Sequence, residues 1–253
     1  MNQEEFYDKM WCEVWNDMEK HNPTAQHLKL LIAKEINRSL PLQTLLDVGC
    51  GAGFNIKSIV EQFPEIKVLG TDLTENICQI ASKNLRKYGQ VSICKLNIEI
   101  NCLNQMFDFI LCNQVLEHIK NDLSALKNLR QMAKKHILIT VPSGKYNSTS
   151  LINGHIRHYT ESELKSKVIQ AGLSIIKIYS WGYPFHSLYK NTLAALPSSY
   201  QSKIGMGSYG FWKKLLSKSI FWLFYFNMSG RGDNIICLCE KKIKKIISNT
   251  KYF

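Results

Sequence analysis

The segment LLDVGCGAGFNIKSI, residues 45–59, constrains the fold more than any other part of the chain. An apolar stretch leads into Gly49, Gly51 and Gly53, and a helical pattern of apolar residues begins directly after them. Glycines between a strand and a helix allow the backbone to approach a ligand closely. The loop contains no lysine, so it is not the phosphate-binding loop of nucleoside triphosphatases. The segment therefore predicts a strand–loop–helix unit that binds another kind of ligand.

Two acids define the chemistry of that ligand. Asp47 precedes the loop, where it would repel a pyrophosphate, and Ile56 stands where dinucleotide-binding loops carry their third glycine. Asp72 lies 19 residues beyond Gly53, at the end of the next predicted strand. A carboxylate at that place binds the two hydroxyls of a ribose. A ligand with a ribose, a positive charge and no phosphate matches S-adenosylmethionine. The alternative for Asp47 is that it only caps a helix at the end of the strand.

Strand-like and helical segments alternate along most of the chain. The segment 107–112 is apolar except for Asp108, as expected for a strand that is largely buried on both faces. Alternation of this kind predicts an α/β fold, namely a doubly wound, seven-stranded and mostly parallel sheet of Rossmann-like type. The predicted strands are residues 44–48, 67–71, 91–96, 107–112, 136–141, 174–179 and 234–240.

Changes of pattern divide the chain into three regions. We expect residues 1–40 to form an N-terminal helical cap and residues 41–181 and 232–245 to form the cofactor-binding core. Residues 182–231 are aromatic and basic and show no alternation of strands and helices. We interpret them as an insertion before the last strand that forms a substrate or lid region.

The glycine loop, the stretch VLGTDLTENICQIA and the stretch FDFILCNQVLEHI together resemble class I S-adenosylmethionine-dependent methyltransferases of the small-molecule type. The resemblance implies a methyltransferase that uses S-adenosyl-L-methionine as its cofactor. It also implies that the loop holds the methionine part of the cofactor, although Asn97 stands where family members usually carry an acid. The implied cofactor-binding residues are Asp47, Gly49, Cys50, Gly51, Gly53, Asp72, Leu73, Asn97, Ile98, Asn113 and Gln114.

Two histidines are candidates for catalytic roles, and three further residues are candidates for substrate contacts. His118 follows the fourth strand, and His155 lies in the stretch NGHIRHYT, which we expect above the carboxyl ends of the strands. Arg157 in the same stretch could clamp an acidic group. Tyr7 and Trp11 lie on one face of the first predicted helix and could cover the site; plain packing is the alternative for all five residues. We predict no metal, because no further acids cluster near His118 in the sequence.

The expected reaction is methyl transfer to an oxygen, nitrogen or carbon of a small-molecule acceptor, including a lipid-linked or glycan acceptor. The net charge of +12 keeps an RNA or protein methyltransferase open as an alternative. A further alternative is an inactive subunit that binds the cofactor. Nucleic acid is disfavoured because no basic-aromatic recognition module is visible.

The aromatic and basic segment 211–226 could line a pocket, contact a membrane surface or form a homodimer interface. The eight cysteines show no CxxC pair and no zinc spacing, which favours reduced thiols. With no signal-peptide pattern and no long apolar run, we expect a cytoplasmic protein, with a peripheral membrane location as the alternative.

Overall fold

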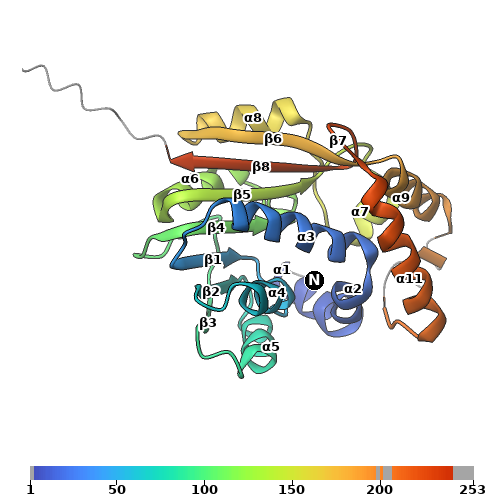
Figure 1. The fold of residues 1–253 in the computed structure, drawn as a ribbon, viewed down its shortest axis with the longest axis horizontal. Coiled ribbons are helices and arrows are strands. Elements are labelled where there is room, and N and C mark those ends of the chain that lie inside the picture. Colours follow the sequence, from blue (N-terminus) through green and yellow to red (C-terminus); the bar gives the residue numbers. More distant parts are fainter. Residues whose placement is uncertain (1–2, 198–199, 202–206, 242–253) are drawn as a thin grey trace, which may run out of the picture.

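The computed structural model describes residues 3–197, 200–201 and 207–241. Its centre is one eight-stranded sheet with the strand order β3-β2-β1-β4-β5-β8-β6-β7 (Figure 1). The strands are β1 Thr44–Val48, β2 Lys67–Asp72, β3 Val91–Lys95, β4 Phe107–Asn113, β5 Ala133–Pro142, β6 Leu173–Tyr183, β7 Met228–Ser229 and β8 Asn234–Lys241. The helices are α1 Gln3–Met10, η1 Trp11–Trp15, α2 Asn16–His21, α3 Pro23–Arg38, α4 Phe54–Gln62, α5 Glu75–Leu85, η2 Leu116–His118, α6 Asp122–Met132, α7 Ser148–Ile152, α8 Glu161–Gln170, α9 Phe185–Ala195, α11 Phe211–Leu223 and η3 Phe224–Phe226.

The predicted fold class is confirmed. Strands β1 to β5 pair in parallel, and β8 lies antiparallel between β5 and β6. The sheet has eight strands rather than the predicted seven, because the two-residue β7 pairs antiparallel with the end of β6. A strand of two residues is too short to leave an alternating pattern in the sequence.

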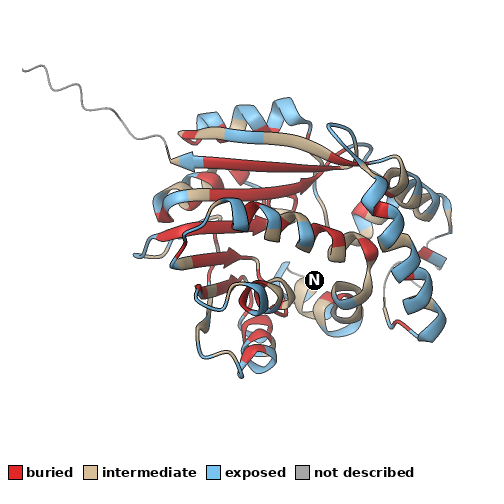
Figure 2. Ribbon diagram, in the orientation of Figure 1, coloured by how far each residue is buried: buried red, intermediate tan, exposed pale blue. Residues whose placement is uncertain are grey.

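Helices cover both faces of the sheet, and each face has its own core (Figures 1 and 2). On one face, α6 and α8 pack on the sheet through side chains such as Leu126, Leu129 and Leu164. On the other face, α3, α4 and α5 contribute to a second core that includes Ile36 and Ile56. Strand β4 is buried over six of its seven residues, which explains why its sequence is apolar apart from Asp108 and the terminal Asn113.

Local signals in the sequence explain where helices begin. Asn22 caps α3, since its side chain accepts hydrogen bonds from the backbone of Thr24 and Ala25, and Pro23 occupies the first helical position. Thr160 and Glu163 form a reciprocal capping box at the start of α8. These caps fix the residues at which α3 and α8 begin.

The division of the chain into a cap, a cofactor-binding core and an insertion remains a prediction, because it assigns a role to each region. Helices α1 to α3 lie in the proposed cap, and α9 and α11 lie in the proposed insertion between β6 and β8. Residues 242–245 of the predicted core lie outside the described residues. Among the described residues, no helix is both long and apolar enough to cross a bilayer.

A buried carboxylate connects the two helices on one face. Asp122, at the start of α6, is 3% exposed and lies 2.7 Å from the Lys167 ammonium and 2.6 Å from the Arg157 guanidinium. The hydroxyl of Tyr159 donates a third bond of 2.6 Å. Burial would raise the pKa of Asp122, but these hydrogen bonds outweigh burial and hold the pKa below its usual value. The carboxylate is therefore stabilised more in the folded state than in the unfolded chain.

We predict that Asp122→Asn lowers the free energy of unfolding by about 3 kcal/mol at neutral pH, because it leaves two cations without their buried partner. The folded pKa lies below the unfolded one, so this stabilisation is complete above the unfolded value of 3.8 and is lost as the pH falls through the folded value. Urea titrations at several pH values would measure it. The matched control is Glu65→Gln, an exposed position where we expect a change within about 0.5 kcal/mol; equal stability of the two variants would contradict the role of Asp122.

Candidate active site

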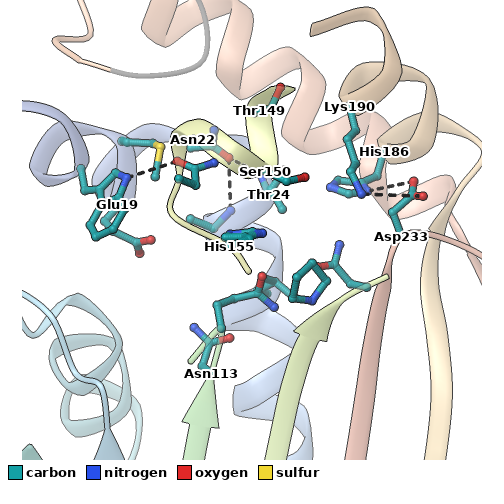
Figure 3. A pocket seen from close by; sticks show the side chains of 18 of the residues that line it. Glu19, Asn22, Thr24, Asn113, Thr149, Ser150, His155, His186, Lys190 and Asp233 are labelled. Carbon is teal, nitrogen blue, oxygen red and sulfur yellow. Dashed lines mark hydrogen bonds and ion pairs between the residues drawn. The ribbon is translucent and has the colours of Figure 1, made fainter. Parts of the chain in front are cut away.

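Two cavities lie at the carboxyl ends of the parallel strands, where open α/β sheets bind ligands. The larger has a volume of about 280 Å³ and the smaller about 130 Å³. Figure 3 shows that side chains from the N-terminal helices, the strand ends and the insertion surround one cavity, the larger of the two. The two cavities share the wall residues Trp11, Trp15, Gly49, Gln114 and His118.

The glycine loop adopts a backbone that other residues would strain. Gly49, Gly51 and Gly53 have φ values of 70°, 54° and 83°, in the left-handed region that favours glycine. A side chain at Gly51 would collide with the ring of Trp11, and one at Gly53 would lie 2.5 Å from Leu85. Gly49 lines both cavities, whereas Gly51 and Gly53 line neither. The three glycines thus shape the loop, and Gly49 alone of them forms cavity wall.

The smaller cavity collects the residues predicted for the nucleoside part of the cofactor. Asp72, Leu73, Asn97 and Ile98 all line it. The Asp72 carboxylate accepts hydrogen bonds of 2.8 Å from the backbone N–H groups of Gly51 and Leu73. Each carboxylate oxygen has a second lone pair, and two such oxygens match the two hydroxyls of a ribose. The amide oxygen of Asn97 accepts a bond from the backbone of Glu99, which fixes the side chain at the cavity wall.

Three carboxyl groups make the surroundings of the loop electronegative. Asp47 is 1% exposed, and neither of its carboxyl oxygens has a hydrogen-bond partner within the described part of the chain. Burial, followed by repulsion from Asp72 and Glu19, raises the pKa of Asp47 well above its usual value. Burial also raises the pKa of Asp72 and of Glu19. Asp47 lines neither cavity, so it lies behind the glycine loop rather than in direct contact with either cavity.

The end of β4 positions two amides between the cavities. The Thr140 hydroxyl donates a 2.6 Å bond to the amide oxygen of Asn113 and accepts a 3.2 Å bond from the amide nitrogen of Gln114. Gln114 has a φ of 55°, the one positive value for a non-glycine residue in the described chain. Backbone strain of this kind concentrates at functional sites. Both amides line the larger cavity, and Gln114 also lines the smaller one.

The candidate catalytic histidines lie together. The ring centroids of His118 and His155 are 5.0 Å apart, and His155 Nδ1 lies 3.3 Å from His158 Nε2. All three line the larger cavity. Burial lowers the pKa of His118 to about 4 and that of His155 to about 2. Both rings are therefore neutral at physiological pH and can donate or accept a hydrogen bond there.

Glu117 joins these histidines in a group that could hold a metal ion. Ligand atoms of Glu117, His118 and His155 lie within 4.8 Å of one another. Both carboxyl oxygens of Glu117 are buried without a hydrogen-bond partner, and His118 Nδ1 lies 3.1 Å from the carbonyl oxygen of Gly154. Such a bond orients an imidazole so that Nε2 can act as ligand. The sequence shows Glu117 and His118 side by side, but only the fold brings His155 to them.

The structure brings two of the three predicted substrate residues to the cavities. Trp11 lines both, and Tyr7 lines the smaller one, where its ring packs edge-on at 5.5 Å from His118. Arg157 lines neither, because its guanidinium is held by Asp122 on the far side of the loop. Cys50 lines the larger cavity with a buried thiol whose pKa is raised by burial and nearby acids.

The larger cavity also contains a polar group of three residues that the sequence did not predict. His186 and Lys190 from α9 face Asp233, which precedes β8 (Figure 3). Lys190 Nζ is 3.9 Å from Asp233 Oδ1, and His186 Nδ1 is 4.0 Å from Asp233 Oδ2. One signal could have revealed this end of the site: Asp233 is the single acid between Glu163 and Glu240.

Comparisons with known proteins show similarity to methyltransferases. Residues 46–136 match the protein family described as "Methyltransferase domain". A malonyl-(acyl-carrier protein) O-methyltransferase of Bacillus cytotoxicus is 27% identical over 57% of this chain and 50% of its own length. A ubiquinone biosynthesis O-methyltransferase of Nitrosomonas europaea is 28% identical over 42% of this chain and 46% of its own length. The chain thus spans about half the length of these curated relatives.

A solved structure extends the similarity to nearly the whole chain. The N-methyltransferase NodS from Bradyrhizobium japonicum, in complex with S-adenosyl-L-homocysteine, superposes with a TM-score of 0.64 at 12% identity. The match covers 96% of this chain and 100% of NodS, and at this identity it shows the fold. Together with the matched domain and the motifs, it confirms the resemblance to class I S-adenosylmethionine-dependent methyltransferases. The predicted cofactor agrees with the S-adenosyl-L-homocysteine that is bound to NodS.

We predict that Glu117→Gln stabilises the fold, and that it does so more at higher pH. Burial raises the pKa of Glu117 from 4.5 to about 8, so the folded protein retains a proton that the unfolded chain releases. The stability of the wild type therefore falls as the pH rises through this interval. The advantage of the variant should grow by on the order of 2–3 kcal/mol between about pH 5.5 and pH 8.

Chemical unfolding at the two pH values measures this difference. The exposed Glu13→Gln serves as the control and should change stability little at either pH. An advantage of Glu117→Gln that is constant with pH would show that the Glu117 carboxyl is ionised in the folded protein.

Proposed function

We propose that this protein transfers the methyl group of S-adenosylmethionine to an oxygen of a small-molecule acceptor. The observation that carries the proposal is the shared wall of the two cavities at Gly49, Gln114 and His118. An in-line displacement requires the donor and the acceptor on opposite sides of the transferred carbon. A nucleoside cavity that adjoins a larger second cavity supports this arrangement. The curated relatives, which are named O-methyltransferases, support oxygen as the acceptor atom.

The charges around the glycine loop support this cofactor. S-adenosylmethionine supplies the reactive methyl carbon and, in its sulfonium, the leaving group. Asp47, Asp72 and Glu19 surround the loop, and the enclosed carboxyl of Asp47 has no hydrogen-bond partner among the described residues. A cationic ligand would relieve their mutual repulsion. In this proposal Asp72 binds the ribose, and the Asn113 and Gln114 amides orient the methionine part.

The weak basicity of the histidines indicates what kind of oxygen is methylated. With pKa values of about 4 and about 2, His118 and His155 are poor acceptors of the proton of an aliphatic alcohol. They can hold an oxygen in position through hydrogen bonds. Lys190 adds a cation at the other end of the same cavity. These features favour an acceptor oxygen that has lost its proton beforehand, as in a carboxylate or a phenolate.

We predict that Asp72→Ala weakens the binding of S-adenosylhomocysteine about 10- to 100-fold, since the ribose hydroxyls lose a charged partner. Calorimetric titration of wild type and variant measures this effect, with NAD as a second ligand that neither should bind. The exposed Glu75→Ala, three residues further along the chain, is the matched control and should bind like the wild type. Unchanged binding by Asp72→Ala would show that the smaller cavity does not bind the ribose of the cofactor.

We predict that methylation of a carboxylate acceptor depends little on pH between about pH 6 and 9, whereas a phenol reacts faster as it ionises. His155→Ala should raise KM for the acceptor about 10-fold through a lost hydrogen bond. Its kcat should fall by less than the 10²–10⁴-fold that removal of a general base causes. Formation of S-adenosylhomocysteine with a panel of malonyl thioesters, phenols and alcohols measures both.

If His155→Ala lost more kcat than this, and if the wild-type rate fell as the pH was lowered, His155 would act as a general base instead. Cofactor binding without turnover on any acceptor would favour an inactive cofactor-binding subunit over an enzyme.

A further inference from the structure

Helix α11 presents an apolar face to solvent rather than to the core. Along its outer side, Phe211 is 73% exposed, Trp212 is 76% exposed, and Leu216 and Trp222 are each 57% exposed. Phe226 in the adjoining η3 is 73% exposed. Figure 2 shows this helix at the edge of the molecule with exposed residues along its length. Exposed large side chains grouped on one helix mark an interaction surface. We call this surface, formed by α11 and η3, the α11 face.

The inner side of the same segment is anchored on the protein. The buried Ser217 hydroxyl bonds to the backbone carbonyl of His21 at the end of α2. Phe221 packs against His27 of α3 with ring centroids 5.9 Å apart. Phe224 is fully buried and packs edge-on against Trp181 at 5.9 Å. The segment is therefore held by polar and aromatic contacts on one side, and its outward apolar residues do not serve to fix it.

The charge of the insertion identifies the partner. Residues 182–231 contain five lysines and one arginine but no aspartate or glutamate. Lys214 and Lys218 are exposed and flank the apolar residues of α11. Positive charges beside exposed aromatic and aliphatic side chains match an interface in which anionic head groups lie next to acyl chains.

We propose that the α11 face docks onto the surface of an anionic lipid bilayer. The 13 residues of α11 span about 20 Å at 1.5 Å per residue, which is shorter than the roughly 30 Å hydrocarbon core. The helix therefore lies in the plane of the interface, with its apolar side chains among the upper acyl chains. Trp212, Trp222 and Tyr225, all exposed, suit the boundary between head groups and hydrocarbon.

Two other occupants fit less well. A symmetric contact with a second copy would bury Lys214 and Lys218 of both copies in one interface, and lysine is depleted at protein interfaces. A nucleic acid would use the positive charges, but it would leave the exposed Leu215 and Leu216 without an apolar environment. An anionic bilayer satisfies the charges and the apolar side chains together.

The α11 face lies near the larger cavity through α9. This helix supplies His186 and Lys190 to the cavity wall, and its Leu188 is 64% exposed. One insertion thus carries both the outward apolar residues and one end of the cavity. The docking proposal needs no assumption about the reaction, so it can fail or hold independently of the proposed methyl transfer.

Vesicle flotation tests the proposal with the full chain. We expect the protein to float with phosphatidylcholine vesicles that contain phosphatidylglycerol, and to remain unbound with phosphatidylcholine alone. The variant Lys214→Glu/Lys218→Glu should bind the anionic vesicles at least about 10-fold more weakly. The control Lys127→Glu/Lys165→Glu makes the same change of net charge at exposed positions on α6 and α8, and it should bind like the wild type. Circular dichroism would verify that each variant is folded.

A second measurement tests insertion of the apolar side chains. Trp212→Ala/Phe226→Ala, at two of the most exposed positions, should reduce binding at least about 10-fold while all lysines remain. Lipids with brominated acyl chains should quench the tryptophan fluorescence of the wild type more than that of this variant. Equal binding by the Lys127/Lys165 and Lys214/Lys218 variants would overturn the proposal. The proposal would also be overturned if the wild type did not float with anionic vesicles. The same holds if the wild type bound no vesicles but formed a dimer in sedimentation that the Lys214/Lys218 variant did not form.

Discussion

The site depends on the bonds that the Asp72 carboxylate accepts from the backbone of Gly51 and Leu73. Through them a single side chain at the end of β2 holds both its own loop and the glycine loop that follows β1. The left-handed backbone of Gly51 aims its N–H group at Asp72, and its missing side chain leaves room for Trp11. The loop shape, the Asp72 carboxylate and the Trp11 ring are therefore one coupled arrangement, in which any side chain at Gly51 would disturb all three.

The parallel part of the sheet could be predicted from the sequence for a physical reason. Strands covered by helices on both sides are largely apolar, so β1 and β4 stand out as short hydrophobic runs with one acid each. Motif residues such as Asp72 and Asn97 could be located because they lie at or just beyond the ends of predicted strands. Their positions in space then follow from the register of neighbouring parallel strands. The two-residue β7 leaves no such signal and was not predicted.

The rest of the site depends on contacts between distant segments, which no local pattern encodes. His155 reaches Glu117 and His118 only because the loop after β5 folds back over the sheet edge. Arg157 looks like a substrate clamp in the sequence, yet the buried carboxylate of Asp122 holds its guanidinium. His186, Lys190 and Asp233 come from both ends of the insertion and meet only when β6 and β8 pair. Their chemistry was visible in the sequence, but their proximity was not.

The insertion between β6 and β8 has two roles, one on its inner side and one on its outer side. Its inner residues must complete a cavity lined with histidines, a lysine and an aspartate, and its outer residues form an apolar and basic surface. The buried Trp181 and Phe224 separate the two, because their edge-on packing fills the space between the sheet and α11. An acceptor with an apolar tail could therefore stay associated with the outer surface while its polar end enters the cavity. Residues 182–231 of this segment are rich in aromatic residues and free of acids, a composition that suits both surfaces at once.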